Sequence, residues 1–165
     1  MFCTECGEKL TLMFANGEGL VPYCKKCEEF RFAQFSTAVS MVAVNRAKDK
    51  VLLARHKGHD DYILFAGYVK KGETAEKAVT REFKEETKLN VVKYKYLSSR
   101  YHEPKNVLML GYLVMAEDGE PVVDEKEIEE VKWFPLDEAL NAIEENYVTA
   151  ESFLKTALNE LKNFK

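Results

Sequence analysis

Three glutamates within one predicted helix carry the clearest chemical signal in this 165-residue sequence. At the helical repeat, Glu85 and Glu86 fall about 60° and about 40° to either side of Glu82, so all three carboxylates share one face. Carboxylates this close repel one another and would weaken an isolated helix. A cation between them removes the repulsion, and oxygen-rich sites of this kind suit Mg²⁺ or Mn²⁺ bound together with substrate phosphates.

The residues around the glutamates fit a metal site that works on phosphates. Arg81 lies one turn before Glu85 and can pair with it or with Glu73, which would hold a carboxylate in a fixed rotamer. The glycines between Gly67 and Glu73 let backbone groups approach a metal or a phosphate closely. A solvated acidic helix is the alternative interpretation. Eight residues between Gly67 and Leu89 have the types and the spacing that such a site needs, and agreement at eight positions by chance is rare, which argues against the alternative.

A second signal lies in the first 27 residues, where two CxxC pairs are separated by seventeen residues: Cys3, Cys6, Cys24 and Cys27. This spacing predicts a zinc ribbon, because each pair aims two sulfurs at one point and the second pair completes a tetrahedron. Two disulfides are the alternative, which a cytoplasmic chain disfavours. The intervening segment predicts a hairpin that turns at residues 16–19. A structural role for the zinc is favoured over contact with nucleic acid.

The predicted elements place both signals. Strands are expected at residues 36–44, 50–54, 62–65, 91–97, 107–116 and 131–134, helices at 74–88, 136–145 and 149–163, and loops at 67–73 and 99–107. Ala75, Val79 and Phe83 form a stripe that would bury the first helix against the sheet and turn its acidic face toward a cleft. Strands on both sides of one helix predict an α/β fold, with a mixed sheet between helices.

Composition excludes several classes of protein. With 24 Lys and Arg against 28 Asp and Glu, the net charge is −4, which gives no general attraction to nucleic acid or to an anionic membrane. The longest apolar run, residues 107–116, is roughly half of what a membrane-spanning helix needs. The first residues lack the pattern of a secretory signal. A soluble, cytoplasmic protein with one main domain and a small attached module is expected.

The stretch from Gly67 to Leu89 resembles the Nudix box, the 23-residue element of Nudix hydrolases, and matches eight of its nine specified positions. The exception is Lys88, where the family usually has glycine at the helix C-cap. The resemblance implies a Nudix α/β/α sandwich over residues 36–165, after a zinc ribbon at residues 1–30. It also implies hydrolysis of a nucleoside diphosphate linked to some other group, X, and a homodimer.

The resemblance assigns roles by position. The ligands of a catalytic Mg²⁺ or Mn²⁺ would be the backbone carbonyl of Gly67 and the side chains of Glu82, Glu85 and Glu86, one of which could take the proton of the attacking water. Glu73 and Arg81 would form a supporting salt bridge. Glu127 resembles the glutamate that completes the metal site downstream, and it is one choice among five acids between residues 124 and 130.

A four-cysteine ribbon before such a domain resembles the NADH pyrophosphatase subfamily. Candidate substrates are therefore NAD(H), ADP-ribose and related dinucleotides or nucleotide sugars, with Tyr68 stacking on a base. The subfamily's SQPWPFPxS motif is replaced by SRYHEPKNV at residues 99–107, which puts NADH itself in doubt. Arg100, Tyr101, His102 and Lys105 instead form a basic and aromatic segment suited to a phosphate with a base or ribose.

A function of a different class is a zinc-ribbon module on a catalytically quiet Nudix scaffold, which would bind or regulate by recognising a nucleotide or an RNA end. The complete glutamate set argues against it, because an inactive site has no physical need for mutually repelling charges. Removal of a nucleotide cap from RNA breaks the same bond on a larger substrate, and it is the one nucleic-acid role that the acidic net charge leaves open.

Overall fold

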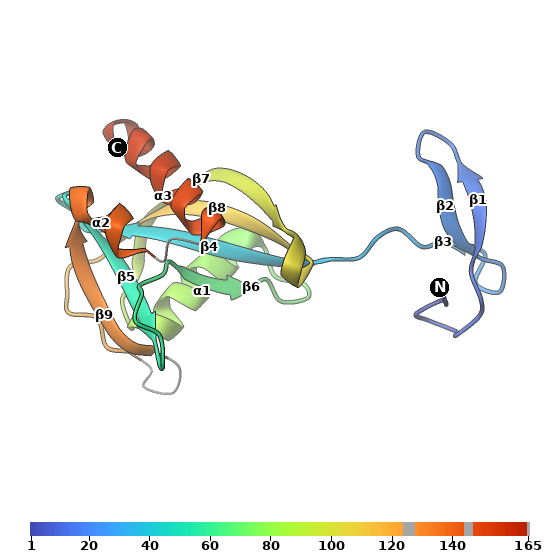
Figure 1. Ribbon diagram of the computed structural model, residues 1–165, viewed down its shortest axis with the longest axis horizontal. Helices are drawn as coiled ribbons and strands as arrows, with labels where there is room; N and C mark the ends of the chain where they lie inside the picture. The colour runs from blue at the N-terminus through green and yellow to red at the C-terminus, as the bar shows by residue number, and fades with distance from the viewer. Residues whose placement is uncertain (124–127, 144–146, 165) are drawn as a thin grey trace. The chain divides into compact units, whose positions relative to one another are not determined.

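The computed structural model describes residues 1–123, 128–143 and 147–164, which form two compact units, Met1–Phe35 and Ser36–Lys165 (Figure 1). The first unit is an antiparallel sheet of β1 (Thr11–Ala15), β2 (Gly19–Cys24) and β3 (Glu29–Phe30). The register of β1 and β2 closes at the pair Ala15↔Gly19, so the predicted hairpin is confirmed.

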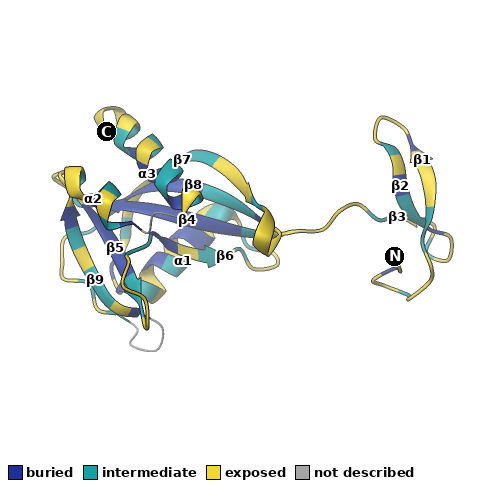
Figure 2. Cartoon of the chain, viewed as in Figure 1, coloured by how far each residue is buried: buried dark blue, intermediate teal, exposed yellow. Residues whose placement is uncertain are grey.

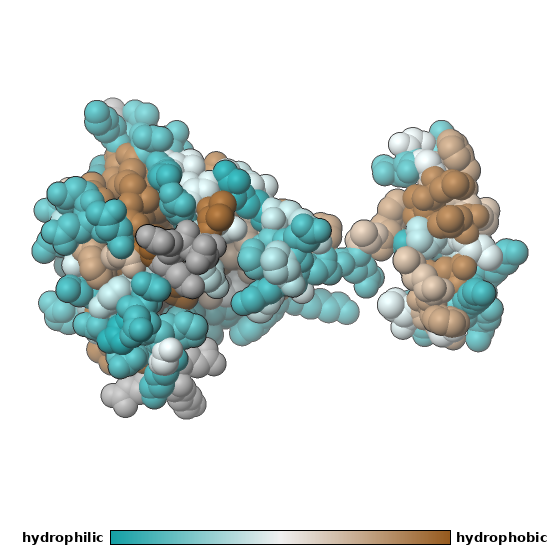
Figure 3. Space-filling model, viewed as in Figure 1, coloured by the Kyte–Doolittle hydropathy of each residue, from teal (hydrophilic) through white to brown (hydrophobic). Residues whose placement is uncertain are grey.

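Apart from Cys3 and Cys24, the buried residues of the first unit lie on one face of this hairpin. Ala15 and Val21 are buried, whereas Leu12, Phe14 and Leu20 on the opposite face are exposed. Figure 3 shows apolar surface on the first unit. A small sheet with one covered face buries too little apolar area to be stable alone, so other bonds must hold it together.

The second unit contains a six-stranded sheet in the order β7-β8-β4-β5-β9, with β6 paired to β4. β4 and β8 are parallel, and the other strand pairs are antiparallel. The strands are β4 (Ser36–Val44), β5 (Lys50–His56), β6 (Phe65–Tyr68), β7 (Val91–His102), β8 (Val107–Ala116) and β9 (Ile128–Pro135).

Helices cover both faces of the sheet. α1 (Ala75–Thr87) packs on one face, and α2 (Leu136–Ala142) with α3 (Val148–Glu160) packs on the other, which confirms the predicted α/β fold. Val39 and Met41 of β4 belong to the core under α1, whereas Val42 and Val44 belong to the core under α3. β4 is buried along most of its length (Figure 2). Two short 3₁₀ helices, Glu103–Lys105 and Leu161–Asn163, complete the fold. No helix in the described ranges has the length and apolar character to cross a membrane.

Helix α1 begins and ends close to the predicted residues. The Thr74 side chain caps its N-terminus by accepting a hydrogen bond from the backbone N–H of Lys77 at 3.3 Å. Val79 and Phe83 are fully buried, so the predicted apolar stripe is confirmed. At the other end Lys88 adopts the left-handed conformation, with φ of 61°, that glycine normally supplies.

Two predicted loops were wrong in part. Gly67 and Tyr68 belong to β6, because they pair with Val39 and Ala38, whereas Tyr62 and Ile63 make only isolated bridges. The basic segment at residues 99–107 is also not a loop: β7 continues through His102 and is followed by a 3₁₀ turn. The strand extends because β8 lies beside it along its whole length, and this pairing depends on tertiary structure.

Candidate functional site

The guanidinium group of Arg81 lies at the centre of the acidic face of α1. It forms a bidentate pair with Glu73, from Nε to Oε1 and from Nη2 to Oε2, both at 2.8 Å. Nη1 donates to Oε1 of Glu82 at 2.6 Å and to Oε2 of Glu85 at 3.2 Å. Nη2 also donates to the backbone carbonyl of Tyr68 at 3.0 Å, which ties the helix to β6.

Glu73 is held in its charged form by these contacts. The Arg81 guanidinium, helped by the backbone N–H of Lys70 at 3.0 Å, lowers the pKa of Glu73 to about 2. The same pairing raises the pKa of Arg81 above its ordinary value. Both side chains are therefore ionised at neutral pH, and together they fix the chain that leads from β6 into α1.

Gly67 and Glu82 approach each other so closely that only glycine fits. A Cβ atom on residue 67 would lie 2.0 Å from Cδ and 2.4 Å from Oε1 of Glu82. The Glu82 carboxylate thus packs directly on the backbone of β6, and its side chain is only 15% exposed. The site needs glycine here for this contact, since β6 has ordinary strand geometry at this position.

The donor set of this face fits a hard divalent cation. Glu82 and Glu85 each accept a hydrogen bond from Arg81 through one carboxylate oxygen, so the second oxygen of each is not used by Arg81. The side chain of Glu85 is 56% exposed to solvent. Glu86, half-buried, follows Glu82 by one helical turn. The single guanidinium of Arg81 pairs with three carboxylates, those of Glu73, Glu82 and Glu85, so this group has more negative than positive charge. Carboxylate oxygens are the ligands that Mg²⁺ and Mn²⁺ prefer. Glu127, the further candidate ligand, lies outside the described residues.

A cavity of about 210 Å³ opens on the other side of β6, against α3. We call it the inner cavity. Ala66, Gly67 and Tyr68 of β6 line it together with residues of β4, β8 and α3 that include Ala38, Ser40, Met109 and Ala150. Gly67 therefore contacts Glu82 and also borders this cavity. Its apolar walls and few polar groups are typical of sites that hold a flat organic group.

A second, more open hollow of about 630 Å³ adjoins the inner cavity; we call it the outer hollow. His102, Tyr147 and Thr149 line both, so the two lie next to each other. Of the residues predicted to bind substrate, Tyr68 and Lys105 border the inner cavity, whereas Arg100 and Tyr101 border the outer hollow. The structure thus brings all four to two adjacent depressions.

Sequence reasoning missed most of the inner cavity. Its walls come from β4, β8 and the start of α3, whose apolar residues look like ordinary core in the sequence. One signal was present: Ser40 is a polar residue in the middle of the apolar run of β4, and it proves to be buried. The start of α3 gave no comparable signal.

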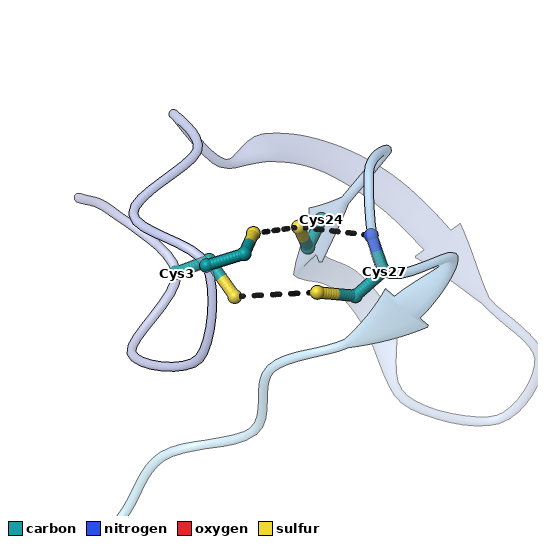
Figure 4. A group of neighbouring side chains, drawn as sticks. Cys3, Cys24 and Cys27 are labelled. Carbon is teal, nitrogen blue, oxygen red and sulfur yellow. Dashed lines mark hydrogen bonds between the residues drawn. The ribbon is translucent and has the colours of Figure 1, made fainter.

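The four cysteines of the first unit lie together, and Figure 4 shows the sulfurs of Cys3, Cys24 and Cys27 turned toward one another. All four Sγ atoms are within 4.8 Å of each other, with Cys3 and Cys27 at 3.9 Å and Cys6 and Cys24 at 3.5 Å. These distances are too long for disulfides. A tetrahedron with Zn–S bonds of about 2.3 Å separates its sulfurs by about 3.8 Å, so the arrangement fits Zn²⁺.

Local charge prepares this cluster for a cation. The Arg31 guanidinium donates to Sγ of Cys3 at 3.3 Å and lowers the pKa of that thiol to about 6. Hydrogen bonds with the neighbouring sulfurs of Cys6 and Cys24 raise the pKa of Cys27 to about 12. The thiol of Cys3 therefore loses its proton easily and the thiol of Cys27 does not. A bound metal ion would overcome the high pKa of Cys27, because it stabilises the thiolate form.

Comparison with known proteins assigns the second unit to a protein family. A family profile described as the NUDIX domain matches residues 34–156. An "NAD-capped RNA hydrolase NudC" of Edwardsiella ictaluri is 34% identical over 138 residues, which are 82% of this chain and 52% of that protein. The chain thus spans about half the length of the curated relatives that it matches.

Solved structures agree on the fold. A NUDIX hydrolase from Nitrosomonas europaea superposes with a TM-score of 0.71 at 21% identity, over 98% of this chain and 92% of that one. The NUDIX domain of Shewanella oneidensis NrtR, crystallised with ADP ribose, has a TM-score of 0.62 at 18% identity, over 82% and 94% of the two chains. At these identities the likeness concerns the fold alone.

Proposed function

The chain belongs to the NUDIX domain family, and on that premise we propose that it is a divalent-metal-dependent pyrophosphohydrolase. Its substrate would be a nucleoside diphosphate linked to another group, X. The observation that carries the proposal is the position of Gly67, which touches the Glu82 carboxylate and borders the inner cavity. A nucleoside held in the cavity would place its phosphates at the acidic face.

The residues of α1 divide the work. Glu82, Glu85 and Glu86, with the backbone carbonyl of Gly67, would hold Mg²⁺ or Mn²⁺. Arg81 fixes the carboxylates of Glu82 and Glu85 through one oxygen each, so that the other oxygen is left for the metal. Glu73 completes the frame by holding Arg81.

The reaction needs charge compensation above all. A pyrophosphate linkage is protected by its own negative charge, which repels an attacking water. A divalent ion bound at the glutamates would neutralise that charge and lower the pKa of a bound water. The protein contributes positioning, and one of Glu82, Glu85 and Glu86 would also accept the proton of the water.

The candidate substrates are NAD(H), ADP-ribose and related dinucleotides or nucleotide sugars. The curated relatives support a substrate of this kind, because they are named as NAD-capped RNA hydrolases. Tyr68 borders the inner cavity and would contact the base. In the first unit, the four cysteines would bind one Zn²⁺ in a structural role, since a closed tetrahedron of thiolates leaves no position for a substrate.

Product analysis by chromatography tests the proposal. The purified protein is offered NADH, NAD⁺, ADP-ribose, FAD and a dinucleoside polyphosphate, with Mg²⁺ or Mn²⁺. We expect cleavage of the pyrophosphate bond to AMP and the complementary nucleotide or sugar phosphate. Glu86→Gln should lose nearly all turnover and keep its fold, because one ligand charge is removed from the metal site.

Glu76→Gln is the matched control, because it removes an exposed carboxylate of the same helix that does not contact Arg81, and the glutamine can still accept the hydrogen bond that Glu76 receives from the Tyr112 hydroxyl at 3.4 Å. This variant should retain the wild-type rate. An unchanged rate in Glu86→Gln would contradict the assigned site. If metal-loaded protein cleaved no member of the panel, the binding or regulatory module would become the better interpretation.

A further inference from the structure

Arg100 differs from every other arginine in this chain. Arg31, Arg46, Arg55 and Arg81 each form an ion pair with at least one carboxylate. Arg100 forms no ion pair and no side-chain hydrogen bond with any residue that the structure describes, although its side chain borders the outer hollow. An arginine that stays unpaired beside a hollow is free to bind an anionic group of a ligand.

Two further basic side chains lie along the two adjacent depressions. His102 borders both the inner cavity and the outer hollow, and Lys105 borders the inner cavity. Neither makes an ion pair within the described ranges. Among the residues that the structure describes, Glu103 is the one acid that lines the outer hollow. Within this described lining, the basic side chains of Arg100, His102 and Lys105 outnumber the acid along the path that leads out of the inner cavity.

We propose that the outer hollow binds a third phosphate group, carried on the 2′ or 3′ oxygen of the ribose of the bound nucleoside. This inference rests on the proposed function, because it takes the inner cavity to hold the base and the acidic face to hold the pyrophosphate. The 5′ side of the ribose then points toward Gly67 and the acidic face, and its 2′ and 3′ oxygens point toward the boundary with the outer hollow at His102, Tyr147 and Thr149. Arg100 binds the added phosphate, and Lys105 and His102 lie beside it.

The chemistry of the hollow favours a phosphate over a second base. Arginine and lysine provide several N–H donors and full positive charge, which match phosphate oxygens. The N-terminus of α3, with Tyr147, Val148 and Thr149, also lines the outer hollow. The positive end of the α3 helix dipole therefore adds to the positive charge of the basic side chains. A ribose phosphate has two sources, namely a small dinucleotide with a phosphomonoester or an RNA strand joined through a phosphodiester.

Direct binding tests the site without any hydrolysis. Titration calorimetry compares AMP with adenosine 2′,5′-bisphosphate and adenosine 3′,5′-bisphosphate on the intact protein. We expect at least one bisphosphate to bind about tenfold more tightly than AMP, as a charge-assisted contact to one more phosphate implies. Arg100→Gln should remove that advantage and leave the affinity for AMP unchanged.

Arg46→Gln is the matched control, because Arg46 is exposed and pairs with Asp118 outside both depressions. It should bind all three ligands as the wild type does. Equal affinity for AMP and both bisphosphates, or an Arg100→Gln variant that keeps the preference, would overturn the inference. This result would leave the proposed function intact if the substrate panel is still cleaved.

A second comparison identifies the source of the phosphate. The values of kcat/KM are measured for NADH against NADPH and for NAD⁺ against a short NAD-capped oligonucleotide, in the wild type and in Arg100→Gln. A gain with NADPH that depends on Arg100 assigns the site to a phosphomonoester. A gain with the capped oligonucleotide assigns it to an RNA strand. Cleavage without either gain contradicts the inference, whereas absence of all cleavage contradicts the proposed function.

Discussion

A Cβ atom on Gly67 would lie 2.0 Å from Cδ of Glu82, so the backbone of β6 and a metal-binding candidate of α1 are packed as one unit. The contact couples the position of a carboxylate to the strand that borders the inner cavity. Any side chain at residue 67 must displace the glutamate, the strand or both.

Gly67→Ala should therefore lower both stability and turnover. Because this contact is half-buried and the Glu82 side chain can shift, overpacking should cost about 1 kcal/mol in the free energy of unfolding, and a displaced Glu82 should reduce kcat more than KM. Urea unfolding and initial-rate kinetics measure the two effects. In Gly67→Ala with Glu82→Ala, the stability should recover while activity stays lost. A Gly67→Ala variant with wild-type stability and kcat would show that the contact is unimportant.

The Glu73–Arg81 pair predicts a pH-dependent loss of stability in acid. The pKa of Glu73 is about 2 in the folded protein against an ordinary value of 4.5, so its contribution is complete above pH 4.5. That contribution falls as the pH drops from 4.5 through about 2. Urea midpoints measured at pH 7, 4 and 3 should converge for the wild type and Glu73→Gln. A constant difference between the two proteins at all three values would contradict the pairing.

Removal of zinc should unfold the first unit and spare the second. We expect metal analysis to find one zinc per chain, and Cys24→Ala to lose it because three thiolates bind far more weakly. Nitrogen-15 NMR spectra of this variant should lose signal dispersion for residues 1–30 and retain it for residues 36–164. Retention of dispersed ribbon signals together with loss of zinc would show that the metal is not structural.

Lys88→Gly should stabilise the protein, by about 0.5–1 kcal/mol. Lys88 adopts a left-handed conformation that costs an L-residue energy and costs glycine almost none, and its side chain makes one exposed contact, with the carbonyl of Glu85 at 2.8 Å. Chemical denaturation measures the change. Lys84→Gly on the same helix, with ordinary helical geometry, should change stability by about 1 kcal/mol in the opposite direction. A loss of stability in both variants would refute the strain at Lys88.

The parts that sequence predicted well depend on local signals. Helix α1 has a capping threonine and an apolar stripe, and the hairpin of the first unit has glycines at its turn, so both could be read from neighbouring residues. The grouping of Glu73, Arg81 and Glu82 followed from helical spacing and from the resemblance. Glu127 and the expected homodimer stay predictions.

The parts that sequence missed depend on partners distant in the chain. The end of β7 is a strand because β8 pairs with it, and Arg100 therefore lies on a strand where a loop was expected. The inner cavity exists because β4, β6, β8 and α3 meet, and each contributes residues that read as core when taken alone. Unpaired charge at Arg100 could be recognised only after the partners of the other arginines were known.

The parallel pairing of β4 with β8 also has a consequence for synthesis on the ribosome. Ser36 pairs with Val107 and Val44 with Met115, so the central strand emerges long before its neighbour does. The last strand pair of the first unit ends at Phe30, so this unit can fold before β4 has found its partner β8. Until β8 emerges, β4 exposes an apolar edge to other nascent chains. Chaperone demand during translation should therefore peak between the release of these two strands.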